Sequence, residues 1–303
     1  MSTDEELLHQ AIADQPEEDT PRLAFADWLD EQGGEVNSTR AEFIRLQVML
    51  YRANVETPEM KAARQRAANL LERYRAAWGF PTGSLQSRCT IRRGFVDELI
   101  IGEEWNGTAS SSETLALLPR HPIYRIRLKG FRPDTFEVFE IFGLLEVPAF
   151  HKVRSLEVGS EQWIDELVGR LLNLGHFPYL ESLALIGTGI TPVTMKSIAE
   201  CPRLTRLHTL RIGFAGAYWF NPQHHMLRGV RDEGVLSLAA SPYLLELREL
   251  SLRNAAIGPV GARALADSAT FANLERLTLT ENPDIGKDAQ QALRQRFGDR
   301  VFL

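Results

Sequence analysis

The chain has 303 residues, of which 44% are hydrophobic and 24% are charged, and its net charge is -6 at pH 7. These values are typical of a globular protein, and the negative charge argues against nucleic-acid binding by the chain as a whole. Its two cysteines, Cys89 and Cys201, lie far apart in sequence, which argues against a disulfide framework and a cysteine-based zinc site. The acidic first residues lack the features of a signal peptide, and no apolar run approaches the roughly 18 residues of a membrane span, so we expect a cytoplasmic protein.

Charge is unevenly distributed along the first third of the chain. Residues 1–37 contain eleven acidic residues and one arginine, a net charge of -10, whereas residues 38–93 contain eleven basic and four acidic residues, a net charge of +7. One interpretation is that acidic helices pack against basic helices. The alternative is that one of these faces meets a charged partner.

Four helices are predicted in this region, beginning near Asp4, Thr20, Ser38 and Pro58. Thr20 is a favourable N-cap before Pro21, and Gly33 and Gly34 should end the second helix. In the third helix, Thr39 and Glu42 have the spacing of a capping box.

Two phrases in these helices carry a resemblance. They read PRLAFADWLDEQG at residues 21–33 and RAEFIRLQ at residues 40–47, and together they resemble the bacterial repeat-companion domain over about residues 3–52. That family is a small helical module at the front of bacterial proteins, often ahead of leucine-rich repeats. The later phrase RRGFVD at residues 92–97 is similar to the way these proteins enter their repeats. The loop at residues 33–38 departs from the family in having an extra glycine, and the resemblance implies no catalytic activity.

Charged residues of the two phrases invite a functional interpretation, but a structural one is favoured. Asp27 should form an interhelical ion pair or a cap with Arg40 or Arg45, with Glu42 alongside, and so fix the helix-loop-helix. Trp28 is expected in the core.

An apolar phrase of the form L-x-x-L-x-L then recurs through the rest of the chain. Its central residues are separated by 27, 30, 27, 27, 40 and 27 positions and are Leu99, Ile126, Leu156, Leu183, Leu210, Leu250 and Leu277. Alternation of apolar residues predicts a short strand, and the spacing leaves room for one helix per repeat. Helices are expected over 191–201, with Met195, Ile198 and Ala199 inward, and over 258–268, with Val260, Ala264 and Leu265 inward.

This pattern resembles leucine-rich repeats of the long, ribonuclease-inhibitor-like type. We therefore expect an α/β fold: a leucine-rich-repeat solenoid with parallel strands on the concave face, helices on the convex face and an N-terminal α-helical capping domain. The expected domains are a helical repeat-companion module at residues 1–85 and an array of about seven repeats at residues 86–303, with an insertion at 213–230. A last helix from Lys287 to Phe297 and a short final strand at residues 300–303 should close the array.

Strand residues that do not face the core should line the concave surface, where such proteins commonly bind partners. The basic candidates for partner binding are Arg125, Arg127, Lys129, Arg211 and Arg253. Their distribution is patchy and does not suit the continuous basic stripe of a nucleic-acid groove. The alternative interpretation is an ordinary solvated strand face.

The 40-residue spacing indicates about 13 extra residues between Ile212 and Asp232. Insertions in repeat proteins map to loops, often on the binding edge, and this one is rich in residue types that interfaces favour. Its candidate partner-binding residues are Tyr218, Trp219, Phe220, His224 and His225. The alternative is that its aromatic residues pack back onto the array.

Signatures of catalysis are absent from the sequence: it has no G-x-S-x-G, P-loop or G-x-G-x-x-G motif, and the adjacent histidines do not point the same way, as metal ligands would. We expect no catalytic residue, metal or cofactor. The prediction is a non-enzymatic protein-protein interaction scaffold with a protein partner, and neither nucleic acid nor membrane as a ligand. The alternative is a regulatory or targeting subunit of an enzyme complex, associated with a kinase or GTPase, that docks through the helical module. The partner's identity, the pathway and the oligomeric state stay open at this stage.

Overall fold

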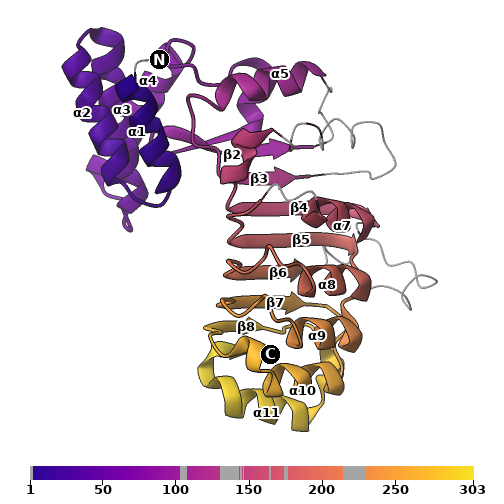
Figure 1. Ribbon diagram of the computed structural model, residues 1–303. Helices are drawn as coiled ribbons and strands as arrows, with labels where there is room; N and C mark the ends of the chain where they lie inside the picture. Colours follow the sequence, from indigo (N-terminus) through magenta and orange to yellow (C-terminus); the bar gives the residue numbers. More distant parts are fainter. Residues whose placement is uncertain are drawn as a thin grey trace. The chain divides into compact units, whose positions relative to one another are not determined.

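The computed structural model describes residues 3–102, 108–129, 143, 145, 147–163, 165–173, 177–213 and 229–303. The fold is mixed α/β, as expected, with nine described strands in one sheet in the order β1 to β9 (Figure 1). Contacts divide the chain into a first unit, Met1–Ile101 with Trp105–Ile126, and a second unit, Gly102–Glu104 with Arg127–Leu303. None of the described helices is long and apolar enough to cross a membrane.

The first unit contains four long helices followed by a hairpin and one more helix. Its elements are α1 (Thr3–Asp14), α2 (Thr20–Gln32), α3 (Glu35–Arg52), α4 (Pro58–Tyr74), a 3-10 helix (Gly83–Arg88), β1 (Cys89–Arg92), β2 (Phe95–Ile101) and α5 (Thr108–Leu117). We expected the helical module to end at residue 85, whereas the contacts group β1, β2 and α5 with the helices. One physical reason is that Phe95 of β2 belongs to the core cluster of α1, α2 and α3.

Two details of the predicted helix starts are wrong. Helix α3 begins at Glu35, not Ser38, because Gly33 and Gly34 adopt positive φ angles and let the chain turn directly into the next helix. Thr39 therefore lies inside the helix, where its hydroxyl donates to the Glu35 carbonyl at 2.6 Å, so it forms no capping box with Glu42. Helix α2 already includes Thr20, and Asp19 occupies its N-cap position.

The predicted interhelical ion pair is present between α2 and α3. Arg45 contacts Asp27 at 2.6 Å and Asp30 at 2.7 Å. Arg40, the other predicted partner of Asp27, is instead buried in the first unit, and its Nη2 donates to the Gly94 carbonyl at 2.7 Å. Trp28 is partly buried and packs against the core, stacked on Phe25 at 5.6 Å between ring centroids.

Strand β1 was not predicted, and it pairs with β2 in antiparallel fashion. The two strands are joined by Arg93 and Gly94, whose φ angles of 49° and 86° are both positive, as a tight hairpin turn requires. Arg93 is held there by side-chain hydrogen bonds to the carbonyls of Pro16 and Glu17, each at 2.7 Å.

Replacing Gly94 with alanine should lower the free energy of unfolding by about 2 kcal/mol. A methyl group at Gly94 would lie 2.9 Å from Cα of Ile44 in α3, and the positive φ adds backbone strain. Urea unfolding followed by circular dichroism measures the change. Gly83→Ala is the matched control, because Gly83 also has a positive φ but nothing within 4 Å of the added methyl group. Equal losses from both variants would mean that the approach to Ile44 has no cost.

The second unit alternates strands and helices. Strand β3 (Arg125–Leu128) spans the boundary, and β4 (Ser155–Trp163), α7 (Asp165–Asn173), β5 (Ser182–Gly189), α8 (Pro192–Ala199), β6 (Thr209–Gly213), α9 (Arg231–Ala239), β7 (Glu249–Arg253), α10 (Pro259–Asp267), β8 (Arg276–Thr278), α11 (Lys287–Phe297) and β9 (Val301–Phe302) follow. All seven predicted strands are confirmed, as are the last helix and the short final strand.

Consecutive strands from β4 to β9 pair in parallel, and their leucine positions align. Leu156, Leu183, Leu210, Leu250 and Leu277 are direct partners across the sheet. At the start of each of strands β5 to β8, two successive backbone N–H groups donate to one carbonyl of the preceding step; the acceptors are Arg154, Glu181, His208 and Arg248. This repeated contact fixes the register before each strand begins.

The predicted helix faces are confirmed in one case and partly wrong in the other. Met195, Ile198 and Ala199 of α8 are buried, and Thr191 caps that helix by accepting from the Val193 N–H. In α10, Val260 is 59% exposed, and the buried positions include Leu265. The helix begins at Pro259, so Val260 falls in its outward-facing first turn.

A single buried asparagine ties two steps of the second unit together. The side chain of Asn282, which follows β8, accepts from the N–H groups of Ala255 and Ile257 and donates to the carbonyls of Leu252 and Leu279. It therefore satisfies backbone groups that neither strand can reach.

Candidate interaction surface

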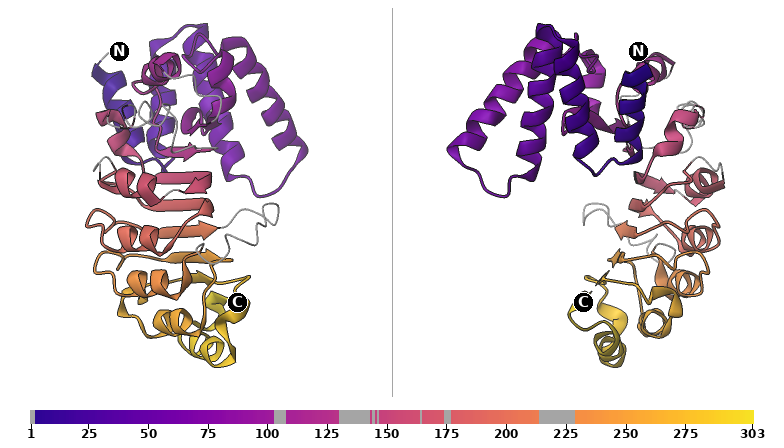
Figure 2. Two further views of the ribbon diagram at one scale, coloured as in Figure 1. Left: turned by 90° about the vertical axis from the view of Figure 1, so that its right-hand side faces the viewer. Right: turned by 60° about the vertical axis from the view of Figure 1, so that its left-hand side comes forward.

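One face of the parallel sheet in the second unit carries no helix among the described residues, and we call it the strand face. Figures 1 and 2 show helices α7 to α11 on the other side of these strands. Because strand side chains alternate, the leucines point toward the helices and the intervening residues lie on the strand face. This is the face on which sequence analysis placed the partner-binding residues.

The strand face is ordered in rows that follow from the register. A first row contains Ser155, Ser182, Thr209, Glu249 and Arg276, and a second row contains Glu157, Ala184, Arg211, Ser251 and Thr278. A third row runs through Gly159, Ile186, Gly213 and Arg253. Ile186 is 38% exposed and is a large apolar side chain on this face.

Four arginines predicted as partner-binding are paired with carboxylates. Arg127 contacts Glu157 at 3.1 Å, Arg211 contacts Glu249 at 3.0 Å, and Arg253 forms an ion pair with Glu281. Arg125, in the first unit, contacts Glu17 at 3.0 Å.

Pairing gives the strand face a mixed electrostatic character. Hydrogen bonding to Glu281 raises the pKa of Arg253, and the bond from Arg253 lowers the pKa of Glu281. Exposed ion pairs of this kind contribute little to stability, so their groups can exchange partners at small cost. A protein surface with both signs of charge is a better match than a polyanion for such a face.

A hollow of about 570 Å³ lies where β6 to β9 begin. The acidic and basic groups at its wall include His208, Arg248, Glu249, Glu275 and Arg276. The guanidinium of Arg276 lies 4.9 Å from the ring centroid of Phe302, which is itself exposed. Because Glu249 and Arg276 also belong to the first row, the hollow extends the strand face toward the end of the sheet.

The remaining predicted site residues divide into two groups. Lys129 directly follows β3 and is exposed. Tyr218, Trp219, Phe220, His224 and His225 lie outside the described residues, as does most of the predicted insertion at 213–230.

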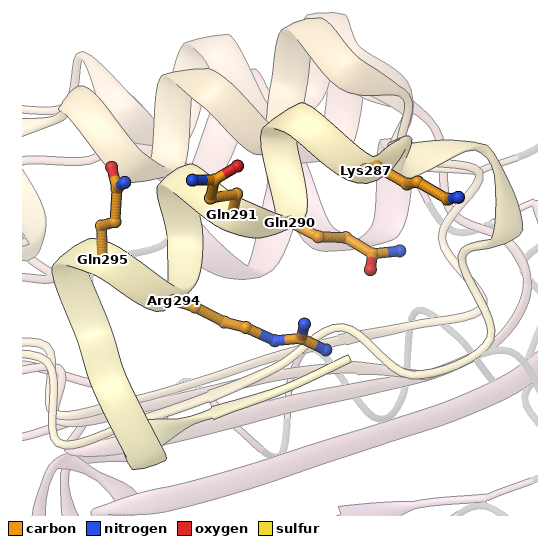
Figure 3. A pocket seen from close by; sticks show the side chains of 5 residues that line it. All are labelled: Lys287, Gln290, Gln291, Arg294 and Gln295. Carbon is orange, nitrogen blue, oxygen red and sulfur yellow. The ribbon is translucent and has the colours of Figure 1, made fainter.

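A second surface hollow, on helix α11, does not form a convergent site. Its volume is about 660 Å³, and its lining residues are Lys287, Gln290, Gln291, Arg294 and Gln295. Figure 3 shows these side chains spreading from the one helix in different directions. A ligand would therefore meet only one wall.

Groups with catalytic or metal-binding potential are few among the described residues. No cluster of three or more histidine, cysteine, aspartate or glutamate side chains within that part of the chain could hold a metal ion. Cys89 and Cys201 are both free thiols, and burial raises the pKa of Cys89 to about 12, which makes it a weak nucleophile.

The first unit buries titratable groups that include Asp97, His121 and Arg40, of which sequence analysis considered only Arg40, as an ion-pair partner of Asp27. Burial raises the pKa of Asp97 to about 6, although Tyr124 donates a hydrogen bond to it at 3.1 Å. Burial lowers the pKa of His121 to about 3 and that of Arg40 to about 9. A basic residue among the apolar positions of a helix is a weak signal for burial, because long side chains usually reach solvent.

Comparison with known protein families found no family model that matches this chain, and comparison with curated proteins found no significant match.

Proposed function

We propose that this chain is a non-enzymatic protein-interaction scaffold that binds a protein partner on the strand face of its second unit. The observation that carries the proposal is the strand face itself: rows of polar and charged side chains in register, with both signs of charge and an exposed Ile186. Interfaces of this kind combine an apolar contact with a polar surround. Residues 213–230 are proposed to add to the same surface.

The proposal includes a finer description of the fold. We infer that the second unit is a leucine-rich-repeat solenoid and the first a repeat-companion module that caps it. In support, the L-x-x-L-x-L phrase recurs at strands of matching register. Asn282 also stands where the extended motif L-x-x-L-x-L-x-x-N requires an asparagine, counted from Leu274.

The test is capture of partners from an extract of the source cell by the tagged full chain and two lysine variants. Ile186→Lys should reduce partner recovery at least tenfold, because a lysine buried at an interface is left unpaired. Val193→Lys is the matched control, since Val193 is also exposed, at 61%, but lies on helix α8. It should leave recovery unchanged.

A third variant lacks residues 213–229 and tests the insertion. Loss of the partner in this variant and in Ile186→Lys would support one continuous surface. A partner that both variants retain, and that is lost only when residues 1–80 are removed, would contradict the proposal. That result would support the alternative, a regulatory subunit of a kinase or GTPase complex that docks through the helical module.

A further inference from the structure

The first unit contains a cleft of about 300 Å³ that none of the features above accounts for. Its lining includes His9 of α1, Phe25 of α2, Arg40 of α3, and the side chains of Trp78 and Arg120. All of its lining residues belong to the first unit, so the cleft is independent of the strand face. Its volume is at the small end of the range for ligand pockets.

Arg40 gives this cleft a buried cation. The side chain is 6% exposed, and its guanidinium lies 4.2 Å from the ring centroid of Phe80 and 5.2 Å from that of Trp78. Nη2 donates to the Gly94 carbonyl, whereas Nη1 is buried with no hydrogen-bond partner in the described part of the chain. The aromatic rings stabilise the charge in part, but a buried N–H without an acceptor is costly.

His9 places a second unpartnered nitrogen at the same cleft. Its Nδ1 is buried and lacks a hydrogen-bond partner among the described residues, and its ring lies 4.7 Å from that of Phe25. Burial, with the positive charges of Arg40 and Arg120, lowers the pKa of His9 to about 4. His9 is therefore neutral at pH 7 and can offer a hydrogen bond without adding charge.

The charges at the cleft select the kind of ligand. Two guanidinium groups, of Arg40 and the exposed Arg120, face one carboxylate, that of Glu5, which leaves a single excess positive charge. The rings of Phe25 and Trp78 and the side chain of Leu29 supply apolar walls. A monoanion with a compact apolar body matches both properties, whereas a phosphate dianion matches neither.

We propose that this cleft binds the carboxylate of a small hydrophobic organic acid. The carboxylate would accept from the guanidinium groups of Arg40 and Arg120, and the apolar body would lie against Phe25 and Trp78. An anion bound there neutralises a guanidinium that is otherwise buried without a carboxylate. The hydrogen bond between a guanidinium and a carboxylate is among the strong ones, because both groups are charged. The site is distinct from the proposed partner surface, and either can fail without the other.

Calorimetric titration of the full chain at pH 7 tests this site, with benzoate as the probe and benzamide as its neutral isostere. Benzoate should bind saturably with a Kd on the order of 1 mM, as its few non-hydrogen atoms allow. Benzamide should bind at least tenfold more weakly, because it lacks the charge. Benzoate should also raise the pKa of His9 from about 4, as measured from its ring resonances by NMR, since a bound anion favours the charged imidazole.

Two arginine variants localise the binding. Arg120→Gln should weaken benzoate binding about tenfold. Its melting temperature is measured first and must match that of the parent chain, which shows that the variant folds normally. Arg45→Gln is the control, since Arg45 is also an exposed arginine of the first unit but pairs with Asp27 and Asp30 instead of lining the cleft. If Arg120→Gln melts early, Arg120→Ala replaces it, and the expected result is the same.

Three results would overturn the proposal. The first is the absence of saturable heat with benzoate up to roughly 20 mM, well above the expected Kd. The second is equal binding of benzoate and benzamide. The third is equal weakening by the cleft variant and by Arg45→Gln, which would mean that benzoate responds only to the overall charge of the chain.

Discussion

Replacing Asn282 with alanine should lower the free energy of unfolding by about 3 to 5 kcal/mol. The side chain accepts from the N–H groups of Ala255 at 2.9 Å and Ile257 at 3.1 Å, and it donates to the carbonyls of Leu252 and Leu279, both at 2.8 Å. The residue is buried, so none of these four backbone groups can turn to water when the amide is removed. Each buried group left without a partner costs about 1 kcal/mol or more.

Urea unfolding followed by far-ultraviolet circular dichroism measures this loss, and Asn273→Ala is the matched control. Asn273 donates one hydrogen bond, at 3.0 Å to the Leu245 carbonyl, from an exposed position. Its replacement should change the free energy by about 0.5 kcal/mol or less, because water can substitute for the lost donor. Similar losses of unfolding free energy from both variants would show that the buried hydrogen bonds of Asn282 stabilise the chain no more than the exposed bond of Asn273.

The regular part of the second unit was predictable from the sequence because one physical requirement repeats there. Leu183, Leu210, Leu250 and Leu277 each need a buried position on a strand, and the strands must pair with equivalent residues opposite each other. The recurring L-x-x-L-x-L phrase expresses that requirement directly. Helix α11 was predictable for a related reason, since Gly286 and Gly298 flank its apolar stripe.

Side-chain pairing on the strand face was not predictable in the same way. Arg211 and Glu249 are 38 residues apart, and they meet only because the register sets Thr209 opposite Glu249 across the longest spacing in the chain. The sequence showed an isolated basic residue, whereas the structure shows an ion pair. Knowing the register of adjacent strands would have been enough to find it.

Local rules also failed where tertiary contacts decide the outcome. Arg40 carries a charge and would be expected to reach solvent, yet it is buried among Phe43, Trp78, Phe80 and Phe95. Phe43 lies on the same helix, but Trp78, Phe80 and Phe95 are distant in sequence, so no local pattern could place them around the guanidinium.

Lowering the pH from 6.5 to 4 should destabilise the chain by about 3 kcal/mol through the buried histidines and Asp97 of the first unit. His121 is 3% exposed; its Nε2–H donates to the Gly79 carbonyl at 3.2 Å, and its Nδ1 accepts from the Val96 N–H at 3.4 Å. In the neutral imidazole, both ring nitrogens therefore form hydrogen bonds to the backbone, one as donor and one as acceptor. Burial and the charge of Arg40 lower its pKa from 6.5 to about 3.

Whether the unfolding free energy rises or falls with pH depends on which state, folded or unfolded, binds more protons. In the unfolded chain His121 and His9 take up protons near pH 6.5, but in the folded chain they do so only near pH 3 and pH 4, respectively. Each histidine therefore lowers the unfolding free energy of the chain as the pH falls below 6.5. Asp97 acts in the opposite direction, because its pKa is raised from 3.8 to about 6 in the folded state. Two histidines against one aspartate leave a net uptake of about one proton on unfolding, or about 1.4 kcal/mol per pH unit.

Two substitutions should change this pH dependence in opposite directions. His121→Gln keeps a neutral donor and acceptor but removes one titrating histidine, so it should flatten the fall in unfolding free energy by about 1.4 kcal/mol per pH unit between pH 6.5 and 4. Asp97→Asn removes the opposing group and should steepen the fall by a similar amount, about 1.4 kcal/mol per pH unit between pH 6 and 4.

Urea unfolding at about pH 8, 6.5, 5 and 4 measures each slope. At pH 8 the histidines are neutral and Asp97 is ionised in both states, so that measurement isolates the cost of each substitution from its effect on titration. A slope for His121→Gln equal to that of the parent chain would mean that His121 is protonated as readily in the folded state as in the unfolded state. Because its two backbone contacts leave no place for a second ring proton, we expect the slopes to differ.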